Sequence, residues 1–287
     1  MGGLERREAS GAPGEGGAVE AHYALGDLAQ RILEALRRAG LDPDQLSPDD
    51  LAPVDEFHVR GREATEELAE LASLAAGQRV LDVGCGLGGT ARHLADRYGV
   101  EVTGVDLTAE YCRVGNMLSE RTRLRDRVEL VTADALELPF ADGGFDVVWT
   151  EHAAMNIEDK PRLYSELRRV LRPDGRLAIY DILQGPGGQV HFPVPWARRP
   201  EISFLVSPAE LRALLERCSF KVLAWQDTTA PAVSWFRARA RALQADRTPA
   251  LGFHLLLGSD AKEIFANQAR NLEEGRIGLV QVVAEAT

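Results

Sequence analysis

The sequence predicts an α/β fold in which a doubly wound, mostly parallel sheet carries helices on both faces. Short runs rich in β-branched residues, such as Arg79–Val83 and Glu101–Asp106, alternate with segments of helical spacing, and this alternation is typical of βαβ units. A glycine-rich segment, Gly84–Gly89, directly follows the first predicted strand, where open parallel sheets bind ligands. By length alone, the chain of 287 residues could form one large α/β domain or two small ones.

Composition and charge exclude several classes of protein. The sequence contains 33 lysines and arginines and 44 acids, a net charge of −11 at pH 7. We therefore expect no nucleic-acid partner, because nucleic-acid binders usually neutralise phosphates with a basic stripe. Neither the 3 cysteines nor the 6 histidines have metal-ligand spacing, so no metal site is predicted. No apolar run approaches the ~20 residues of a membrane span and no signal pattern is present, so we expect no membrane partner and a cytoplasmic location.

The segment before the first strand is predicted to form a tail and a lid. Residues 1–19 contain six glycines and no aromatic residue, so we expect a disordered tail there. Residues 20–75 are predicted to form an N-terminal helical lid over the ligand site. Within the lid, Leu25–Leu36 have helical spacing, and a second helix is expected at Ala64–Leu74, after a linker at Pro53–Gly61.

The main domain is predicted at residues 76–287, with insertions at 184–206 and 229–276. The first insertion is dense in glycine and proline, and the second is helical and precedes the last strand. A turn at Arg172–Gly175 is expected to introduce the fifth strand. In order, the expected core elements are strand 79–83, helix 90–97, strand 101–106, helix 109–124, strands 128–132 and 145–150, helix 160–171, strand 176–181, helix 207–217, and strands 220–225 and 278–284.

The glycine-rich segment alone does not separate two classes of cofactor. Gly84, Gly86 and Gly89 satisfy the dinucleotide fingerprint GxGxxG, so an NAD-dependent dehydrogenase is one interpretation. Asp82, in the first strand, favours a different ligand. Its carboxylate could receive the positively charged amino group of a methionine moiety, but it would repel a pyrophosphate.

Acids also follow the next two strands. Asp106 ends the second strand, where a carboxylate can accept hydrogen bonds from both ribose hydroxyls. Asp134 follows the third strand, where it could accept a hydrogen bond from an adenine amino group, or simply cap the following turn. Three acids at three successive strand ends suit a cationic adenosyl ligand.

Several motifs then occur in a specific order between residues 75 and 185. They are Val80–Gly89, Val105-Asp106, Ala133–Phe140, Phe145–Trp149 and Leu171–Leu177. In these motifs the sequence resembles the class I S-adenosylmethionine-dependent methyltransferases. The resemblance implies S-adenosylmethionine as cofactor and a Rossmann-like sheet of seven strands, one of them antiparallel.

The resemblance also implies cofactor contacts along these motifs. It assigns Asp82, Gly84 and Gly86 to the methionine end, Asp106 to the ribose, and Asp134 with Ala135 to the adenine. We expect further cofactor contacts from Cys85, Leu107 and Glu151.

Catalytic residues are expected where the fourth strand ends, at Glu151 and His152. Methyl transfer is an in-line displacement, so positioning the acceptor matters most, and a hydroxyl acceptor also benefits from a base such as histidine. We predict His152 as the base or a substrate contact; the alternative is a histidine that bonds a loop carbonyl. The other residues predicted to bind substrate are Tyr23, His58, Asn156, His191 and Trp196.

The flanking segments narrow the resemblance. His22-Tyr23, Pro53–His58, Ala153–Ile157 and Asn267–Arg276 are similar to segments of bacterial proteins grouped with sarcosine and dimethylglycine N-methyltransferases. The resemblance implies N-methylation of a small amine such as sarcosine or dimethylglycine, with a small molecule as the partner. O- or C-methylation of a biosynthetic small molecule and a non-catalytic S-adenosylmethionine-binding module are the alternatives. A homodimer is compatible with the sequence.

Overall fold

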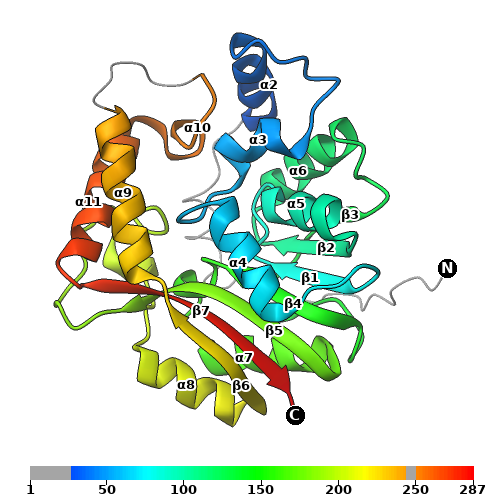
Figure 1. Cartoon of the computed structure of the whole chain (residues 1–287), viewed down its shortest axis with the longest axis vertical. Coiled ribbons are helices and arrows are strands. Elements are labelled where there is room, and N and C mark those ends of the chain that lie inside the picture. Colours follow the sequence, from blue (N-terminus) through cyan, green and yellow to red (C-terminus); the bar gives the residue numbers. More distant parts are fainter. Residues whose placement is uncertain (1–26, 244–249) are drawn as a thin grey trace.

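A seven-stranded sheet forms the centre of the computed structural model, which describes residues 27–243 and 250–287 (Figure 1). The strands lie in the order β3-β2-β1-β4-β5-β7-β6. Neighbours from β3 to β5 pair in parallel, whereas β7 pairs antiparallel with both β5 and β6. The predicted doubly wound sheet with one antiparallel strand is confirmed. The strands are β1 Arg79–Val83, β2 Glu101–Asp106, β3 Val128–Thr132, β4 Phe145–Glu151, β5 Leu171–Gln184, β6 Phe220–Asp227 and β7 Ile277–Ala286.

Helices cover both faces of this sheet (Figure 1). The α-helices of the described residues are α2 Leu28–Arg38, α3 Pro48–Asp55, α4 Arg62–Ala72, α5 Gly89–Tyr98, α6 Ala109–Arg121, α7 Lys160–Val170, α8 Pro208–Arg217, α9 Thr229–Leu243, α10 His254–Leu257 and α11 Ala261–Glu273. Val80 packs in one core cluster with α4 and α5, whereas the next residue, Leu81, packs in a second cluster with α7 and α8. Successive strand residues point to opposite faces, so β1 is buried on both sides.

A third apolar cluster joins the N-terminal helices to later parts of the chain. It contains Leu28 and Ile32 of α2, Leu51 of α3, Val114 of α6 and Leu255 of α10. In Figure 1 these elements lie together at one end of the sheet. The helices before β1 are therefore packed onto the core, and their role as a lid stays a prediction.

The sequence interpretation missed α3, because it treated Pro53–Gly61 as a linker. The helix instead begins at Pro48, with a capping box in which Ser47 Oγ accepts from the Asp50 N–H and the Asp50 carboxylate accepts from the Ser47 N–H. Pro48 is compatible with a first helical turn, where its missing N–H would have no partner. Pro53 lies inside this short helix, and its presence obscured the pattern.

The predicted turn at Arg172–Gly175 lies within β5 rather than before it. Leu171 already pairs with Phe145 of β4, and Arg176 pairs with Val147, so residues 172–175 bulge out between two paired positions. Asp174 has a φ of 58°, a left-handed conformation that aspartate adopts more readily than most residues. β5 is therefore interrupted by a bulge near its start.

Two further predictions concern the whole chain. Within the described ranges, no helix combines the length and apolar character needed to cross a membrane. The predicted tail at residues 1–19 lies outside the described residues. The domain boundaries at 20–75 and 76–287 stay predictions.

Candidate active site

A large cavity lies at the carboxyl ends of β1 to β4, where parallel sheets usually hold their ligands. Its volume is about 2130 Å³, including solvent space at its mouth. Among the described residues that line it, eight are acids and none is a lysine or arginine, and we call it the acidic cavity. The acids are Asp55, Asp82, Asp106, Asp134, Glu151, Glu158, Asp159 and Glu201. Such a lining favours a cationic ligand over an anion.

The glycines of the loop after β1 expose backbone atoms to this cavity. Gly84 and Gly86 have φ values of 80° and 54°, which glycine adopts without strain. A Cβ on Gly84 would lie 2.4 Å from the Cβ of Ala153, so no larger residue fits there. A Cβ on Gly86 would meet nothing within 4 Å, so its absence leaves room for a ligand to approach the backbone. The N–H groups of Gly84 and Cys85 anchor the loop by donating to the Val105 carbonyl at 2.8 and 3.0 Å.

Asp82 provides a buried carboxylate with an unsatisfied oxygen. Asp82 is 2% exposed, and its Oδ2 has no hydrogen-bond partner within the described part of the chain. Burial raises the pKa of Asp82 well above its usual range, and the nearby charges of Glu151 and Asp106 raise it further. A buried acceptor without a donor is unfavourable, so Asp82 is suited to receive a cationic donor from a ligand.

Asp106 holds the glycine loop and also lines the cavity. Its Oδ2 accepts a hydrogen bond from the Gly86 N–H at 2.9 Å, and its Oδ1 accepts from the Thr108 N–H at 2.8 Å. Burial raises its pKa, although these two hydrogen bonds act in the opposite direction. Each oxygen keeps acceptor capacity, so the carboxylate can bind ribose hydroxyls while it fixes the loop. Leu107 lines the cavity beside it.

Asp134 and Ala135 line the cavity beyond β3. Asp134 is exposed, and its Oδ1 accepts from the Leu136 N–H at 2.8 Å. This contact is the turn-capping role that the sequence also allowed. The second carboxylate oxygen is available for an adenine contact, which stays a prediction.

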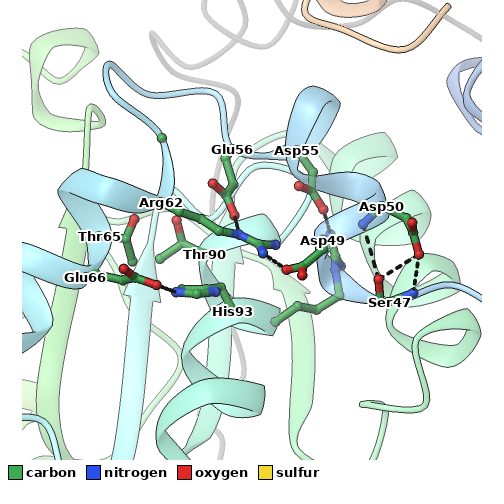
Figure 2. A network of polar contacts seen from close by, with 12 residues as sticks. Ser47, Asp49, Asp50, Asp55, Glu56, Arg62, Thr65, Glu66, Thr90 and His93 are labelled. Atoms are coloured by element: carbon green, nitrogen blue, oxygen red, sulfur yellow. Dashed lines mark hydrogen bonds and ion pairs between the residues drawn. The ribbon is translucent and has the colours of Figure 1, made fainter. Parts of the chain in front are cut away.

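Glu151 is held by two threonines that the sequence interpretation missed. Thr90 Oγ1, on α5, donates to Oε2 at 2.6 Å, and Thr65 Oγ1, on α4, donates to Oε1 at 3.1 Å. Figure 2 shows both threonines among the side chains of these two helices. The contacts join residues 61 and 86 positions apart, so no local motif could predict them. They fix the carboxylate where β4 opens into the cavity.

His152 does not have the geometry of a general base, in contrast to our prediction. Its Nε2 accepts a hydrogen bond from the Val59 N–H at 3.2 Å, and its Nδ1 lies 3.1 Å from the Tyr180 carbonyl oxygen, which can only accept. Both ring nitrogens therefore have backbone partners, and the ring is neutral. Burial and the neighbouring His58 lower the pKa of His152 to about 3. The structure places His152 as a link between the segment after α3 and β5.

A second cavity adjoins the acidic cavity, and its volume is about 430 Å³, including solvent space at its mouth. Phe57, His58 and His152 line both, so the two cavities share a wall. Six aromatic side chains line the second one, and we call it the aromatic cavity. They are Phe57, Trp196, Trp235, Phe236, Phe253 and Phe265. They come from the segment after α3, the loop after β5, and the segment that spans α9 to α11.

The remaining predicted substrate residues divide between these cavities and other places. Asn156 lines the acidic cavity, and its Nδ2 donates to the Trp196 and Ile202 carbonyls at 2.7 and 3.0 Å. Trp196 is 1% exposed, lines the aromatic cavity and donates from Nε1 to Ser203 Oγ at 2.9 Å. His191 lies outside both linings, where its Nε2 is 2.9 Å from Glu274 Oε2, so its predicted substrate role is not supported. Tyr23 lies outside the described residues.

Polar contacts attach the segment after α3 to α4 and α5 (Figure 2). Arg62 Nε donates to Glu56 Oε1 at 2.5 Å, and Arg62 Nη1 also contacts Asp49. His58 follows in this segment. Its Nε2 lies 3.0 Å from the Gly61 carbonyl oxygen, and its Nδ1 lies 3.7 Å from Glu151 Oε2. The segment thus places His58 on the wall that the two cavities share.

Together, the sheet topology and the acidic cavity define a Rossmann-like protein built to bind a cationic nucleoside. A family model described as a methyltransferase domain matches residues 81–179. The chain is 37% identical over 166 residues to methyltransferase GfsG of Streptomyces halstedii, a match that spans 55% of this chain and 58% of that protein. It is 33% identical to O-methyltransferase rstn1 of Aspergillus nomiae, over 62% of this chain and 80% of that protein.

A solved structure of a sarcosine dimethylglycine methyltransferase from Galdieria sulphuraria, itself described as putative, has the same fold. The two share 22% sequence identity and a TM-score of 0.63, over 79% of this chain and 85% of that one. The chain therefore belongs to the class I S-adenosylmethionine-dependent methyltransferases, and S-adenosylmethionine is its cofactor. The unsatisfied oxygen of Asp82, the open space at Gly86 and the absence of lining cations fit this cationic cofactor.

Proposed function

We propose that the protein is an O-methyltransferase that acts on a small molecule without negative charge, with His58 as its general base. The observation that carries the proposal is the position of His58 on the wall shared by the acidic and aromatic cavities. The cofactor would occupy the acidic cavity, held by Asp82, Asp106 and the Gly84–Gly86 backbone. The acceptor would then enter from the aromatic cavity.

The ring of His58 has one nitrogen suited to take a proton. Because the Gly61 carbonyl can only accept a hydrogen bond, Nε2 at 3.0 Å from it carries the proton and Nδ1 is the basic nitrogen. Nδ1 lies 3.7 Å from Glu151 Oε2, close enough for the carboxylate to stabilise the imidazolium that proton transfer creates. The Gly61 carbonyl thus orients the ring, and Glu151 lies beside the nitrogen that would take the proton.

S-adenosylmethionine supplies a methyl group on a sulfonium, from which a nucleophile displaces it in line. His58 would remove the proton of the acceptor hydroxyl at Nδ1 as that oxygen took the methyl group and the bond from that methyl to sulfur broke. The proton would then pass to solvent. Trp196 and Phe236 are buried, and the apolar lining favours the acceptor over water as the nucleophile.

Two observations favour an oxygen acceptor without negative charge over sarcosine or dimethylglycine. Those amino acids carry a carboxylate, and no lysine or arginine is among the described residues that line either cavity. A buried carboxylate without a cation would be unfavourable. In addition, the match to rstn1 spans 80% of that protein, which is named as an O-methyltransferase.

The test combines product identification with a pH profile. The protein is incubated with S-adenosylmethionine and separate panels of phenols, alcohols and amines, which include sarcosine and dimethylglycine, and products heavier by one methylene are identified by mass spectrometry. With the best acceptor, His58→Gln is expected to lower kcat by about 10²–10⁴-fold and to remove the acidic limb of the pH profile. His191→Asn is the control, because His191 lies outside both cavity linings, and it should keep that limb. Methylation of sarcosine, or full activity of His58→Gln, would contradict the proposal.

A further inference from the structure

Gln268, on α11, is a buried polar residue that lines the aromatic cavity and has no hydrogen-bond partner. The residue is 2% exposed. Neither its carboxamide oxygen nor its nitrogen pairs with any group in residues 27–243 and 250–287. Asn271, also buried and one turn later on the same helix, is in contrast fully engaged with the backbone of His191. Unlike Asp82 Oδ2, the amide atoms of Gln268 are not fully enclosed by protein, so the amide faces the cavity, where a ligand can pair with it.

We infer that the aromatic cavity binds an aromatic acceptor carrying a second, uncharged polar group, and that Gln268 recognises that group. The inference rests on the proposed function only in assigning this cavity to the methyl acceptor. A carboxamide offers both a donor and an acceptor, so it can pair with a hydroxyl, a carbonyl or an amide of the ligand. Gln268 is thus a specificity-determining residue.

The surrounding side chains define the rest of the acceptor. Phe265 precedes Gln268 by one turn of α11, so the two share a face of the helix. Ring centroids lie 5.1 Å apart for Phe57 and Phe253, and 6.1 Å apart for Phe253 and Phe265, so aromatic rings continue from the segment after α3 to α11. These rings pack against one another, and the faces they turn to the cavity suit a planar aromatic ligand.

Charge excludes an anionic ligand from this cavity. Arg239 stacks over the Trp235 ring at 4.7 Å, but it is not among the residues that line the cavity. The polar lining is limited to His58, His152 and Gln268, and the two ring nitrogens of His152 are already paired.

The experiment measures binding without turnover. The full-length protein is first saturated with S-adenosylhomocysteine, which has no methyl group to transfer. Calorimetry then gives the Kd of 2-naphthol, of 2,6-dihydroxynaphthalene and of 6-hydroxy-2-naphthoate. We expect the second hydroxyl to tighten binding about tenfold, the effect of one added hydrogen bond, and the carboxylate to weaken it. In Gln268→Leu the advantage of the second hydroxyl should disappear, whereas 2-naphthol should bind as before.

Gln226→Leu is the matched control, because Gln226 is exposed on β6, away from the cavity. It should leave all three affinities unchanged. Thermal unfolding provides a readout without ligand: neither Gln268→Leu nor Gln226→Leu is expected to lower the Tm, since the Gln268 amide faces the cavity and Gln226 is exposed. A Tm lowered by Gln268→Leu would show that the amide supports the fold instead, and equal Kd values for the two naphthols in the unmodified protein would show that no second polar group is recognised.

Failure of this inference can be distinguished from failure of the proposed function. If the naphthols bind as expected but none is methylated, the cavity selects ligands as inferred and the O-methyltransferase proposal is wrong. If methylation depends on His58 but Gln268→Leu keeps the same preference among acceptors, the proposed function stands and the role of Gln268 is wrong.

Discussion

Arg92 and Asp55 form an ion pair in the interior, with Nη2 and Oδ2 2.6 Å apart and side chains that are 0% and 2% exposed. Arg92 lies on α5, and Asp55 is the last residue of α3. The same guanidinium donates from Nη2 to the Leu87 carbonyl at 2.7 Å, within the glycine loop. The pair therefore connects the N-terminal helices to the glycine loop, where the cofactor is predicted to bind.

Asp55→Ala is expected to destabilise the fold strongly, because it leaves Arg92 buried without its counter-ion. Breaking one partner of a buried pair typically costs about 3–5 kcal/mol, against about 0–1 kcal/mol for an exposed pair. Urea denaturation would measure the free energy of unfolding. Glu273→Ala is the control, since Glu273 pairs with Arg237 on the surface at 2.9 Å. Equal effects of the two variants would contradict the importance of the buried pair.

Asp82→Asn should change affinity and stability in opposite directions. Loss of a charged acceptor is expected to weaken S-adenosylmethionine binding by about 1.5–3 kcal/mol, or roughly 10–100-fold. The cofactor-free protein should unfold at a higher temperature, because a buried carboxylate with an unsatisfied oxygen has been neutralised. Calorimetry and thermal unfolding measure the two effects. The exposed Asp142, replaced by Asn, provides the control, and unchanged affinity in Asp82→Asn would remove this residue from the cofactor site.

Cofactor affinity should increase with pH. Burial raises the pKa values of Asp82 and Asp106 above the usual 3.8, so both protonate as the pH falls through these raised values. Protonated carboxyls attract the cationic cofactor less, and its binding at intermediate pH should release protons. In the cofactor-free protein the sign is reversed: these groups stabilise the fold below pH 3.8 and lose that contribution as the pH rises through their raised pKa values. Calorimetry in buffers of different ionisation heat would detect the released protons, and proton uptake would contradict the assignment.

His152→Asn should loosen the segment after α3 without removing the catalytic base. His152 has a φ of 52°, a left-handed conformation that asparagine tolerates better than alanine, so the backbone is expected to persist. The Val59 N–H loses its acceptor, and its hydrogen exchange should become faster. His152→Ala should add about 1 kcal/mol of destabilisation from backbone strain. Unchanged exchange at Val59 in both variants would show that this hydrogen bond does not hold the segment.

The strands and the acids at their ends could be predicted because their signals are local. β1, β2 and β3 have the predicted bounds, and Asp82, Asp106 and Asp134 all line one cavity. β-Branched runs and turn residues determine such elements within a few positions. The presence of one antiparallel strand came from the family resemblance rather than from periodicity, and the position of β7 between β5 and β6 was not predicted.

The catalytic residues could not be assigned in the same way, because their partners are distant in sequence. His152 appeared to be a base since it follows a strand, but its Nε2 meets the Val59 N–H, 93 positions away. Gln268 carries no motif, and only the packing of α11 shows that it lines the aromatic cavity. Whether a polar group has a hydrogen-bond partner depends on the folded chain, and the spacing of residues in the sequence does not predict it.

The position of β7 also constrains how the protein is made. Because β7 lies between β5 and β6, β6 has no neighbour in the sheet until the ribosome has added residues 277–286. The side chain of Gln281, on β7, donates to the Ala64 carbonyl of α4 at 2.7 Å. The helix α4 is synthesised early, but this contact can form only after β7 has been synthesised. During translation the edge of the sheet at β5 therefore stays unpaired. The nascent chain exposes this edge to chaperones or to aggregation until β7 has been synthesised.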